Sequence, residues 1–482
     1  MIHLGVIVAF LTVYLREMLD APLLAGRLST PEIVALTFLP LVGAGLLYHA
    51  VVWRCGRHMD ERGSHRAIRI AERATRLFTI STLVLHALAV MVFGWLDLIR
   101  AWIGDLVLID ELIALGLPVA AMAFAYFVMY PIDRRLREAA MYSRIERGDP
   151  VHPFPSRTRF VLLATRQHVL FMLVPLAVIL AWGEGSERVF GMIGVDPEGT
   201  GASVVQMLGA VAVLALMPPV LCRLWDTVPL SPGPVREAIA QICDAHRVRV
   251  RELLLWRTGG TMVNGAVIGL LPRLRYVVVT DALVEALEPE QVAAVAAHEV
   301  GHVRRRHMPW LAASVLGSVT VIGTGLGWVA NAIPLRLTEG IPLGDESVVG
   351  AFLVVTLVGV LLTLGFVSRR FEWQADAFAA QHLSGMRPGE GDMVITENAA
   401  RAMSGALGRV ARLNAMDPNR FTWRHGSIRT RQERLKALIG ERADSIGADR
   451  LASRVKLGCL LSLIVGGVMV GVDIIFVLSA SS

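Results

Sequence analysis

The stretch "VAAHEVGH", Val295 to His302, places two histidines four residues apart, with a glutamate directly after the first. Four residues are about one helical turn, so on a helix His298 and His302 share a face, with Glu299 beside them. Two imidazoles in this arrangement can bind one Zn²⁺, and the glutamate stands where it can take a proton from water. The stretch therefore predicts half of a zinc site, because a catalytic site needs a third ligand and one open position.

The residues around this stretch predict a small domain of helices and strands. "LEPEQVAAVAAHEVGHVRRRH" is typical of a helix, with Pro289 suited to its first position and basic residues suited to its last turn. His307, five residues after His302, lies off the ligand face and is expected on the surface. Upstream, "PVREAIAQICDAHRV" has helical spacing, and "RELLLWRT", "TMVNGAVIGLL" and "LRYVVVT" are short β-branched runs that predict strands.

The rest of the chain is typical of a membrane protein. Its 482 residues are 54% hydrophobic and 18% charged, with a mean hydropathy of +0.55. A soluble protein carries roughly 25% charged residues. About nine stretches are long and apolar enough to span a bilayer. These are Met1–Leu15, Ile33–Trp53, Leu77–Ile99, Leu106–Tyr130, Phe160–Trp182, Ala202–Leu221, Leu311–Ile333, Val348–Val367 and Leu457–Leu478. Asp105, Asp110 and Glu111, near the outer end of the fourth stretch, are expected to reach water.

The charges of the loops predict the orientation. The loops after the second and fourth spans hold seven arginines each, whereas "GEGSERVFGMIGVDPEGTG" and "IPLRLTEGIPLGDES" hold one each and are acidic. Basic loops face the cytoplasm. This alternation places residues 223–309 and 369–456 on the cytoplasmic side. The net charge of +6 is then explained by membrane topology, and no nucleic-acid partner is expected.

A third ligand can come from "FEWQAD", which follows the eighth span. Glu372 and Asp376 are four residues apart, so both carboxylates share one helix face. One can bind the metal, and the other can accept the ring N–H of a ligating histidine and fix its tautomer. By itself this pair is more typical of a span's charged end; beside the two histidines it favours a metal site.

Together these features predict a mainly α, polytopic membrane protein with five segments. Residues 1–225 form an N-terminal transmembrane region of about six spans. Residues 226–310 form the first half of a catalytic domain, and residues 311–368 a transmembrane hairpin. Residues 369–456 form the second half of the domain, and residues 457–482 a C-terminal transmembrane helix.

The ordered motifs resemble the integral-membrane zinc metallopeptidases that include the HtpX heat-shock proteases and the type I CaaX prenyl proteases. The resemblance covers residues 232–438. "EWQAD" matches the ExxxD of that family, "NGA" resembles its Asn-Ala strand motif with Gly265 inserted, and "RHGSIRTR" resembles its His-Pro…Arg segment with Gly426 in place of Pro. A two-span hairpin separates HExxH from ExxxD in that family, as it does here.

The resemblance implies an α+β domain of the gluzincin type that holds one Zn²⁺ per chain and hydrolyses peptide bonds. His298, His302 and Glu372 would be the ligands, and Asp376 would support His298 or His302. Glu299 would be the general base, His425 a hydrogen-bond donor to the transition state and Arg431 its supporting cation. An extended substrate would lie along Asn264, Gly265 and Ala266.

The partners expected are the lipid bilayer and a membrane-associated protein or peptide, either cleared in quality control or processed. The expected location is a bacterial inner membrane, with the catalytic domain in the cytoplasm. Two alternatives stay open. One is a signal transducer whose peptidase domain cleaves a partner. The other is an intramembrane protease of the site-2 type, which the charges flanking the HExxH helix disfavour. The oligomeric state, the substrate and the role of the last span are not indicated.

Overall fold

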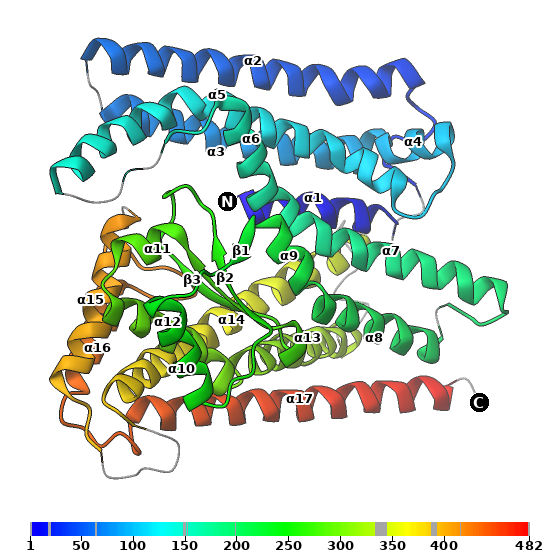
Figure 1. Cartoon of the computed structure of the whole chain (residues 1–482). Coiled ribbons are helices and arrows are strands. Elements are labelled where there is room, and N and C mark those ends of the chain that lie inside the picture. The colour runs from blue at the N-terminus through cyan, green and yellow to red at the C-terminus, as the bar shows by residue number, and fades with distance from the viewer. Residues whose placement is uncertain are drawn as a thin grey trace. The chain divides into compact units, whose positions relative to one another are not determined.

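The computed structural model describes residues 2–17, 21–62, 65–147, 151, 153–197, 199–332, 345–386, 393–414 and 416–480. The fold is mainly helical with one small sheet, as predicted, and it divides into two compact units, residues 1–227 and 228–482 (Figure 1). Most of the predicted acidic loop "IPLRLTEGIPLGDES" and the first residue of the first predicted span lie outside the described residues. The finer division into five segments stays a prediction.

The first unit consists of helices. Two single π-helical segments, η1 and η2, interrupt long helices, and short helix α4 follows a sharp turn at Gly94. The elements are α1 (Ile2–Glu17), α2 (Thr30–Arg62), α3 (His65–Ala87), η1 (Leu88–Phe93), α4 (Trp95–Ile103), α5 (Ile109–Arg147), α6 (Arg157–Ala164), η2 (Thr165–Leu170), α7 (Phe171–Met192), α8 (Thr200–Leu216) and α9 (Pro218–Leu224).

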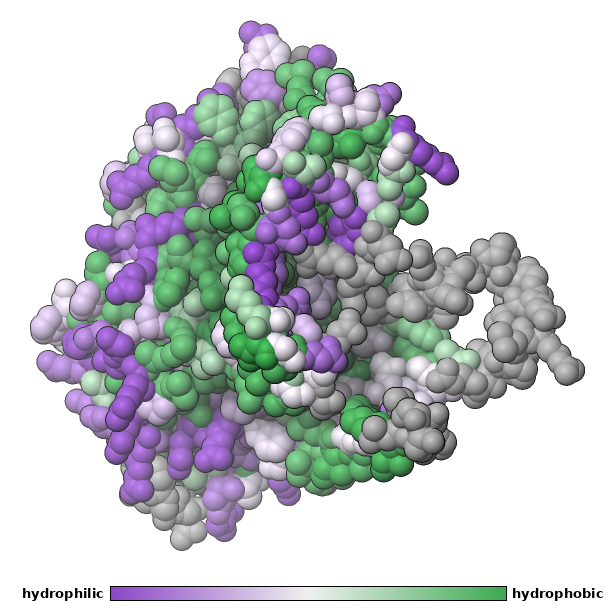
Figure 2. Space-filling view, turned by 90° about the vertical axis from the view of Figure 1, so that its right-hand side faces the viewer, coloured by the Kyte–Doolittle hydropathy of each residue, from purple (hydrophilic) through white to green (hydrophobic). Residues whose placement is uncertain are grey.

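Seven helical stretches among the described residues are long and apolar enough to cross a bilayer, so the chain is an integral membrane protein. Four lie in the first unit and three in the second. The bent pair α8 and α9, which meet at 47°, counts as an eighth if it is one span. The described part of α1 is too short to qualify, so the predicted count of nine is not confirmed. Large apolar side chains such as Leu46 and Leu362 stay exposed on the spans, and broad apolar areas are visible in Figure 2.

The prediction that Asp110 and Glu111 reach water is wrong. Both side chains are fully buried at the start of α5, where each pairs with Arg100 of α4. The reason is the turn at Gly94, whose φ of +79° ends the preceding span early. The chain after Gly94 forms α4, which packs on α5 and covers the two carboxylates. Asp105, in contrast, is exposed and pairs with Arg188.

The second unit contains a four-stranded sheet in the order β1-β2-β4-β3. The strands are β1 (Thr227–Pro229), β2 (Glu252–Trp256), β3 (Gly265–Ile268) and β4 (Tyr276–Thr280). β2 and β4 are parallel, and β3 is antiparallel to β4 and lies at the edge. Every residue of β4 is buried, as expected for a β-branched run in the middle of a covered sheet.

The described part of the second unit also contains eight helices. They are α10 (Pro234–Ala245), α11 (Asp281–Ala286), α12 (Pro289–Arg304), α13 (His307–Ala332), α14 (Asp345–Leu383), α15 (Glu397–Leu413), α16 (Ile428–Ala437) and α17 (Gly447–Ala480), with a 3₁₀ turn η3 (Pro272–Leu274). Of these, α11 and α12 pack on the sheet, and α12, α14 and α16 carry residues of the site. α12 begins with a capping box between Glu288 and Gln291 and with Pro289 in its first turn. Its apolar face, including Val292 and Val300, belongs to one core with residues of β4 and α14.

Candidate metal centre

Helix α12 brings the two predicted histidine ligands together. His298 and His302 are one turn apart, and their Nε2 atoms lie 3.2 Å from each other. His298 is buried and His302 partly buried. Both rings therefore point to one place on the helix face, as the HExxH spacing predicts.

Helix α14 supplies the predicted third ligand. The Glu372 carboxylate lies 3.6 Å from Nε2 of His298 and 3.6 Å from Nε2 of His302. One donor atom from each of the three residues lies within 4.8 Å of the other two, so this group can hold a metal ion. α14 is one continuous helix from Asp345, so the span that precedes Glu372 also fixes its position. Two nitrogens and one carboxylate oxygen are a donor set that suits Zn²⁺.

The surrounding hydrogen bonds decide which histidine nitrogens face the shared position. Asp376 Oδ1 lies 2.9 Å from Nδ1 of His298, a contact that favours a proton on Nδ1, and Nε2 of that ring is turned toward His302 and Glu372.

The tautomer of His302 follows from a longer chain of contacts. Gln374 Nε2 donates to Asp449 over 2.6 Å, so its amide oxygen faces His307 Nε2, 2.9 Å away, and accepts a hydrogen bond from it. His307 Nδ1 is then an acceptor, 2.8 Å from Nδ1 of His302, which donates to it. This leaves Nε2 of His302 without a proton and turned toward Nε2 of His298, 3.2 Å away. A cation between the two nitrogens would accept a lone pair from each ring.

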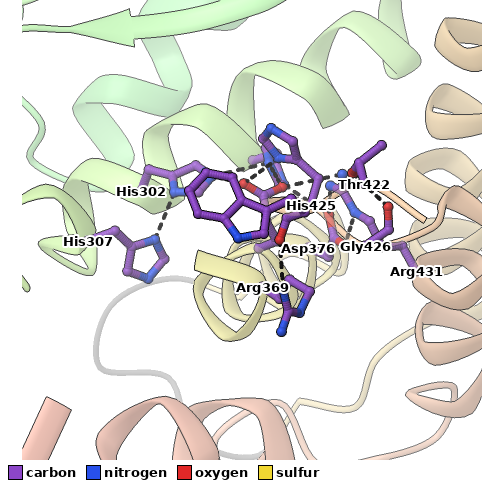
Figure 3. Close-up of polar contacts among 11 residues, drawn as sticks. His302, His307, Arg369, Asp376, Thr422, His425, Gly426 and Arg431 are labelled. Atoms are coloured by element: carbon purple, nitrogen blue, oxygen red, sulfur yellow. Dashed lines mark hydrogen bonds and ion pairs between the residues drawn. The ribbon is translucent and has the colours of Figure 1, made fainter. Parts of the chain in front are cut away.

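The prediction that His307 lies on the surface is wrong. His307 is fully buried, stacks on Phe371 at 4.4 Å and contacts His302 (Figure 3). The error came from treating the helix as continuous. α12 ends at Arg304, and Arg306 adopts a φ of +56°, which turns the chain before α13 begins. Pro309, in the first turn of α13, was the available signal for this break.

A buried ion pair orients the carboxylates. Arg431 on α16 contacts both oxygens of Asp376, at 2.8 and 2.6 Å, and lies 3.3 Å from Glu372. Such a two-pronged contact fixes the plane of the carboxylate. The resemblance implies that Arg431 supports His425, and that role stays a prediction; the contacts that the structure shows for its guanidinium are with Asp376 and Glu372.

His425 reaches the site from the loop before α16. Its Nδ1 lies 2.9 Å from Glu372, and half of its side chain is exposed. The loop is a tight turn in which Thr422 and Gly426 exchange backbone hydrogen bonds of 3.0 and 2.9 Å. Arg369 donates to the Trp423 carbonyl and ties the loop to α14 (Figure 3).

Gly426, the departure from the family's usual Pro, has a structural reason in this loop. Its φ is +74°, and its N–H donates to Thr422. Proline cannot adopt this φ and has no N–H to donate. The turn is therefore built by different means here, and it still brings His425 to Glu372.

Burial dominates the electrostatics of the general-base candidate. It raises the pKa of Glu299 to about 7; the charge of Glu372 also raises it, and His298 opposes this. Burial likewise lowers the pKa of His302 to about 4. Burial would lower the pKa of Arg431 too, but the neighbouring carboxylates reverse this, so its net pKa lies above the ordinary value.

The predicted substrate strand lies against the HExxH helix. Asn264 pairs with Thr280, whose N–H donates to the Asn264 carbonyl. By the alternation of an antiparallel ladder, the backbone groups of Gly265 and Val267 then face the open edge of the sheet. The N–H of Val267 donates to Glu299. A Cβ on Gly265 would come within 3.0 Å of Val295, so glycine permits this close approach to α12.

Residues 259–399 match the model of Peptidase family M48. This range includes α12 and, on α14, Glu372 and Asp376. The chain contains a peptidase family M48 domain. The resemblance seen in the sequence motifs is thereby confirmed, although the matched range covers only part of the chain.

Several known proteins are similar to this chain. A CAAX prenyl protease 1 homologue of Arabidopsis thaliana is 25% identical over 181 residues, covering 36% of this chain and 42% of that protein. A protease HtpX homologue of Bordetella pertussis is 26% identical over 238 residues, covering 45% of this chain and 79% of that protein. The chain thus spans less than half the length of the CAAX prenyl protease it matches.

Among solved structures, the crystal structure of Ste24p from S. mikatae is 13% identical, with a TM-score of 0.47. The match covers 86% of this chain and 100% of the Ste24p chain.

Proposed function

We propose that this M48 chain is a membrane-integrated zinc endopeptidase that hydrolyses membrane or membrane-proximal proteins at the cytoplasmic face, in quality control or processing. The observation that carries the proposal is the cluster of His298, His302 and Glu372, whose ligand atoms lie within 4.8 Å of one another, with Glu299 at the position after His298 on the same helix. A tetrahedral site with three protein ligands leaves one position open for catalysis.

Zn²⁺, when bound by His298, His302 and Glu372, would polarise the scissile carbonyl and favour loss of a proton from water. Glu299 acts as the general base, since it takes the proton of the attacking water and then passes it to the leaving amine. Its pKa of about 7 suits both steps near neutral pH.

Other residues bind the substrate and its developing charge. An extended peptide would pair with the open edge of β3, where the backbone groups of Gly265 and the carbonyl of Val267 are oriented away from β4, while the N–H of Val267 is bound to Glu299. His425 is half exposed beside Glu372 and donates a hydrogen bond to the oxyanion. Arg431 keeps Asp376 and Glu372 ionised and correctly turned.

The test is a Glu299→Gln variant of the full-length protein, purified in detergent and incubated with an unfolded membrane-protein substrate. Loss of the general base should lower the rate of cleavage on the order of 10²- to 10⁴-fold, while metal analysis should still find one zinc per chain. The matched control is Glu290→Gln, because the side chain of Glu290 is exposed on the same helix. Unchanged cleavage by Glu299→Gln would overturn the proposal.

The same variant can identify the substrate. Cells that carry only Glu299→Gln should accumulate the proteins that the wild type cleaves, and proteomics of their membranes would reveal them. Cleavage sites that map to the cytoplasmic side would support the proposed orientation. Sites on the outer side would contradict it.

A further inference from the structure

One end of the sheet carries an arginine-rich pocket. β2 and β4 are parallel and begin at this end, and β3 runs the other way and finishes here. The segment before β2 and the β3–β4 hairpin therefore meet. They line an open and mostly apolar hollow of about 850 Å³, the arginine pocket, where the exposed residues Arg249, Arg251 and Arg273 lie beside Val250, Leu271 and Pro272.

Hydrogen bonds within the protein hold this pocket in shape. The guanidinium of Arg275 donates to the carbonyls of Gly269, Arg249 and Leu270, at 3.1, 3.2 and 2.5 Å. The N–H of Arg251 donates to the Arg275 carbonyl over 2.6 Å. Gly269 has a φ of +107°, and a Cβ there would lie 2.3 Å from a backbone oxygen. The pocket is therefore a built feature of the hairpin.

The charge of the pocket is not balanced by the protein. Within the described part of the chain, the guanidinium groups of Arg249, Arg251 and Arg273 have no ion pair or hydrogen bond of their own. Between Ala245 and Thr280 the single acidic residue is Glu252, and it is bound to Arg236 over 2.7 Å. Three cations around one cavity attract an anion, and the planar guanidinium matches phosphate oxygens in particular.

The pocket lies at the end of the domain where the chain enters the bilayer. α12 runs in the same direction as β3, because Val295 lies beside Gly265 and Glu299 beside Val267. The end of α12 is therefore at the same end of the sheet as the hairpin. The membrane span of α13 begins at His307, three residues after α12 ends.

Exposed leucines give the pocket an apolar rim. Leu270 and Leu271, at the hairpin tip, are 46% and 47% exposed. Apolar side chains beside unpaired arginines suit a ligand that has both a charged head and a hydrocarbon part.

We propose that the arginine pocket binds the headgroup of an anionic phospholipid. The phosphate lies among Arg249, Arg251 and Arg273, and the glycerol and upper acyl groups pack on Leu271 and Pro272. The lipid would anchor the hairpin that joins β3 to β4. Because β3 is the edge strand, the lipid would then hold that edge at the membrane surface. The binding itself does not depend on peptidase activity.

The test is native mass spectrometry of the full-length protein in neutral detergent, titrated with phosphatidylglycerol or phosphatidylcholine. Each arginine near an anionic headgroup contributes roughly fivefold in affinity. The triple variant Arg249→Gln, Arg251→Gln and Arg273→Gln should therefore lose on the order of 100-fold in affinity for phosphatidylglycerol. The control variant changes three exposed arginines outside the pocket, Arg401, Arg412 and Arg442, to Gln and should bind as the wild type does.

Four results would overturn the proposal. Equal binding of phosphatidylcholine, or an unchanged phosphatidylglycerol affinity in the triple variant, would remove the anionic lipid from the pocket. Complete displacement of the lipid by inorganic phosphate at equal concentration would show an anion site without lipid recognition. Tight binding of a heparin polyanion without phosphatidylglycerol binding would assign the arginines to another partner. If the triple variant does not fold, Arg273→Gln alone should still cost roughly fivefold.

Discussion

The second unit contains two groups of charged side chains that differ in where their counter-charges lie. At the metal centre, Arg431 pairs with Asp376 and Glu372, and all three side chains are buried. In the arginine pocket the charges have one sign, and within the described residues nothing in the chain neutralises them. A buried charge must find its partner inside the fold, whereas an exposed group of like charges is available to a partner from outside.

This difference has an energetic consequence. Removing one member of a buried pair leaves the other without water or a counter-ion, which is costly. Removing one of several exposed like charges relieves repulsion and changes the folded state little. Substitutions in the two regions should therefore differ in size and in what they affect.

The largest effect is expected for Arg431→Met, which keeps the length of the side chain and removes its charge. Asp376 and Glu372 would be left buried without their cation, so the free energy of unfolding should fall by about 3–5 kcal/mol. Thermal unfolding in detergent measures this. Arg429→Met, on the exposed face of the same helix, removes a solvent-exposed pair with Glu433 and should cost less than about 1 kcal/mol. Equal effects of the two variants would contradict the comparison.

A smaller effect should come from the pH dependence of stability in the metal-free protein. The pKa of Glu299 is raised from 4.5 to about 7 by burial, so the folded state holds its proton more tightly than the unfolded state. This contribution, about 3 kcal/mol, is fully present below pH 4.5 and is lost as the pH rises through about 7.

Unfolding temperatures of the metal-free wild type and of Glu299→Gln, measured between pH 4.5 and 8, isolate this group. The wild type should lose stability with rising pH relative to the variant. Parallel curves would show that Glu299 titrates normally.

His307→Phe should have a moderate effect that is specific to the metal. Phenylalanine can keep the stacking on Phe371 but cannot accept a hydrogen bond from Nδ1 of His302. The tautomer of His302 is then no longer fixed. Loss of such a supporting contact lowers metal affinity by roughly 10- to 100-fold, measured by zinc competition with a chelator. His246→Phe is the control, because His246 contacts His382 and is not part of this hydrogen-bonded chain. A similar loss in both variants would sink the assignment.

The smallest effect on stability should come from the triple change of Arg249, Arg251 and Arg273 to Gln. Exposed and unpaired side chains contribute little to folding, so the free energy of unfolding in detergent should stay within about 0.5 kcal/mol of the wild type. A large destabilisation would mean that the pocket is held together by these charges. The comparison with the metal centre would then fail.

Sequence predicted the parts of the site that depend on local periodicity. His298 with His302, and Glu372 with Asp376, are each four residues apart on one helix, so the spacing alone places them on shared faces. Their assembly from α12 and α14 was inferred from the resemblance and from the need for a third ligand. The roles of His425 and Arg431 came from the resemblance alone and stay predictions.

What the sequence did not predict depends on turns. His307 joins the site because the chain turns at Arg306, and Asp110 and Glu111 are buried because it turns at Gly94. At each point a continuous helix was assumed, and a single residue with positive φ changed the direction of the next element. Gln374 and Asp449 were missed because their contact joins α14 to α17, which no local pattern records.

The separation of the ligands along the chain has a consequence for biosynthesis. A ribosome makes His298 and His302 before it makes α13, α14 and therefore Glu372. Until both of those helices have entered the bilayer and packed together, the nascent chain holds two ligands without the third. Under the proposed function, membrane insertion would act as a delay, because a half-made chain without its third ligand could not yet cleave its own unfolded segments or the translocation machinery around it.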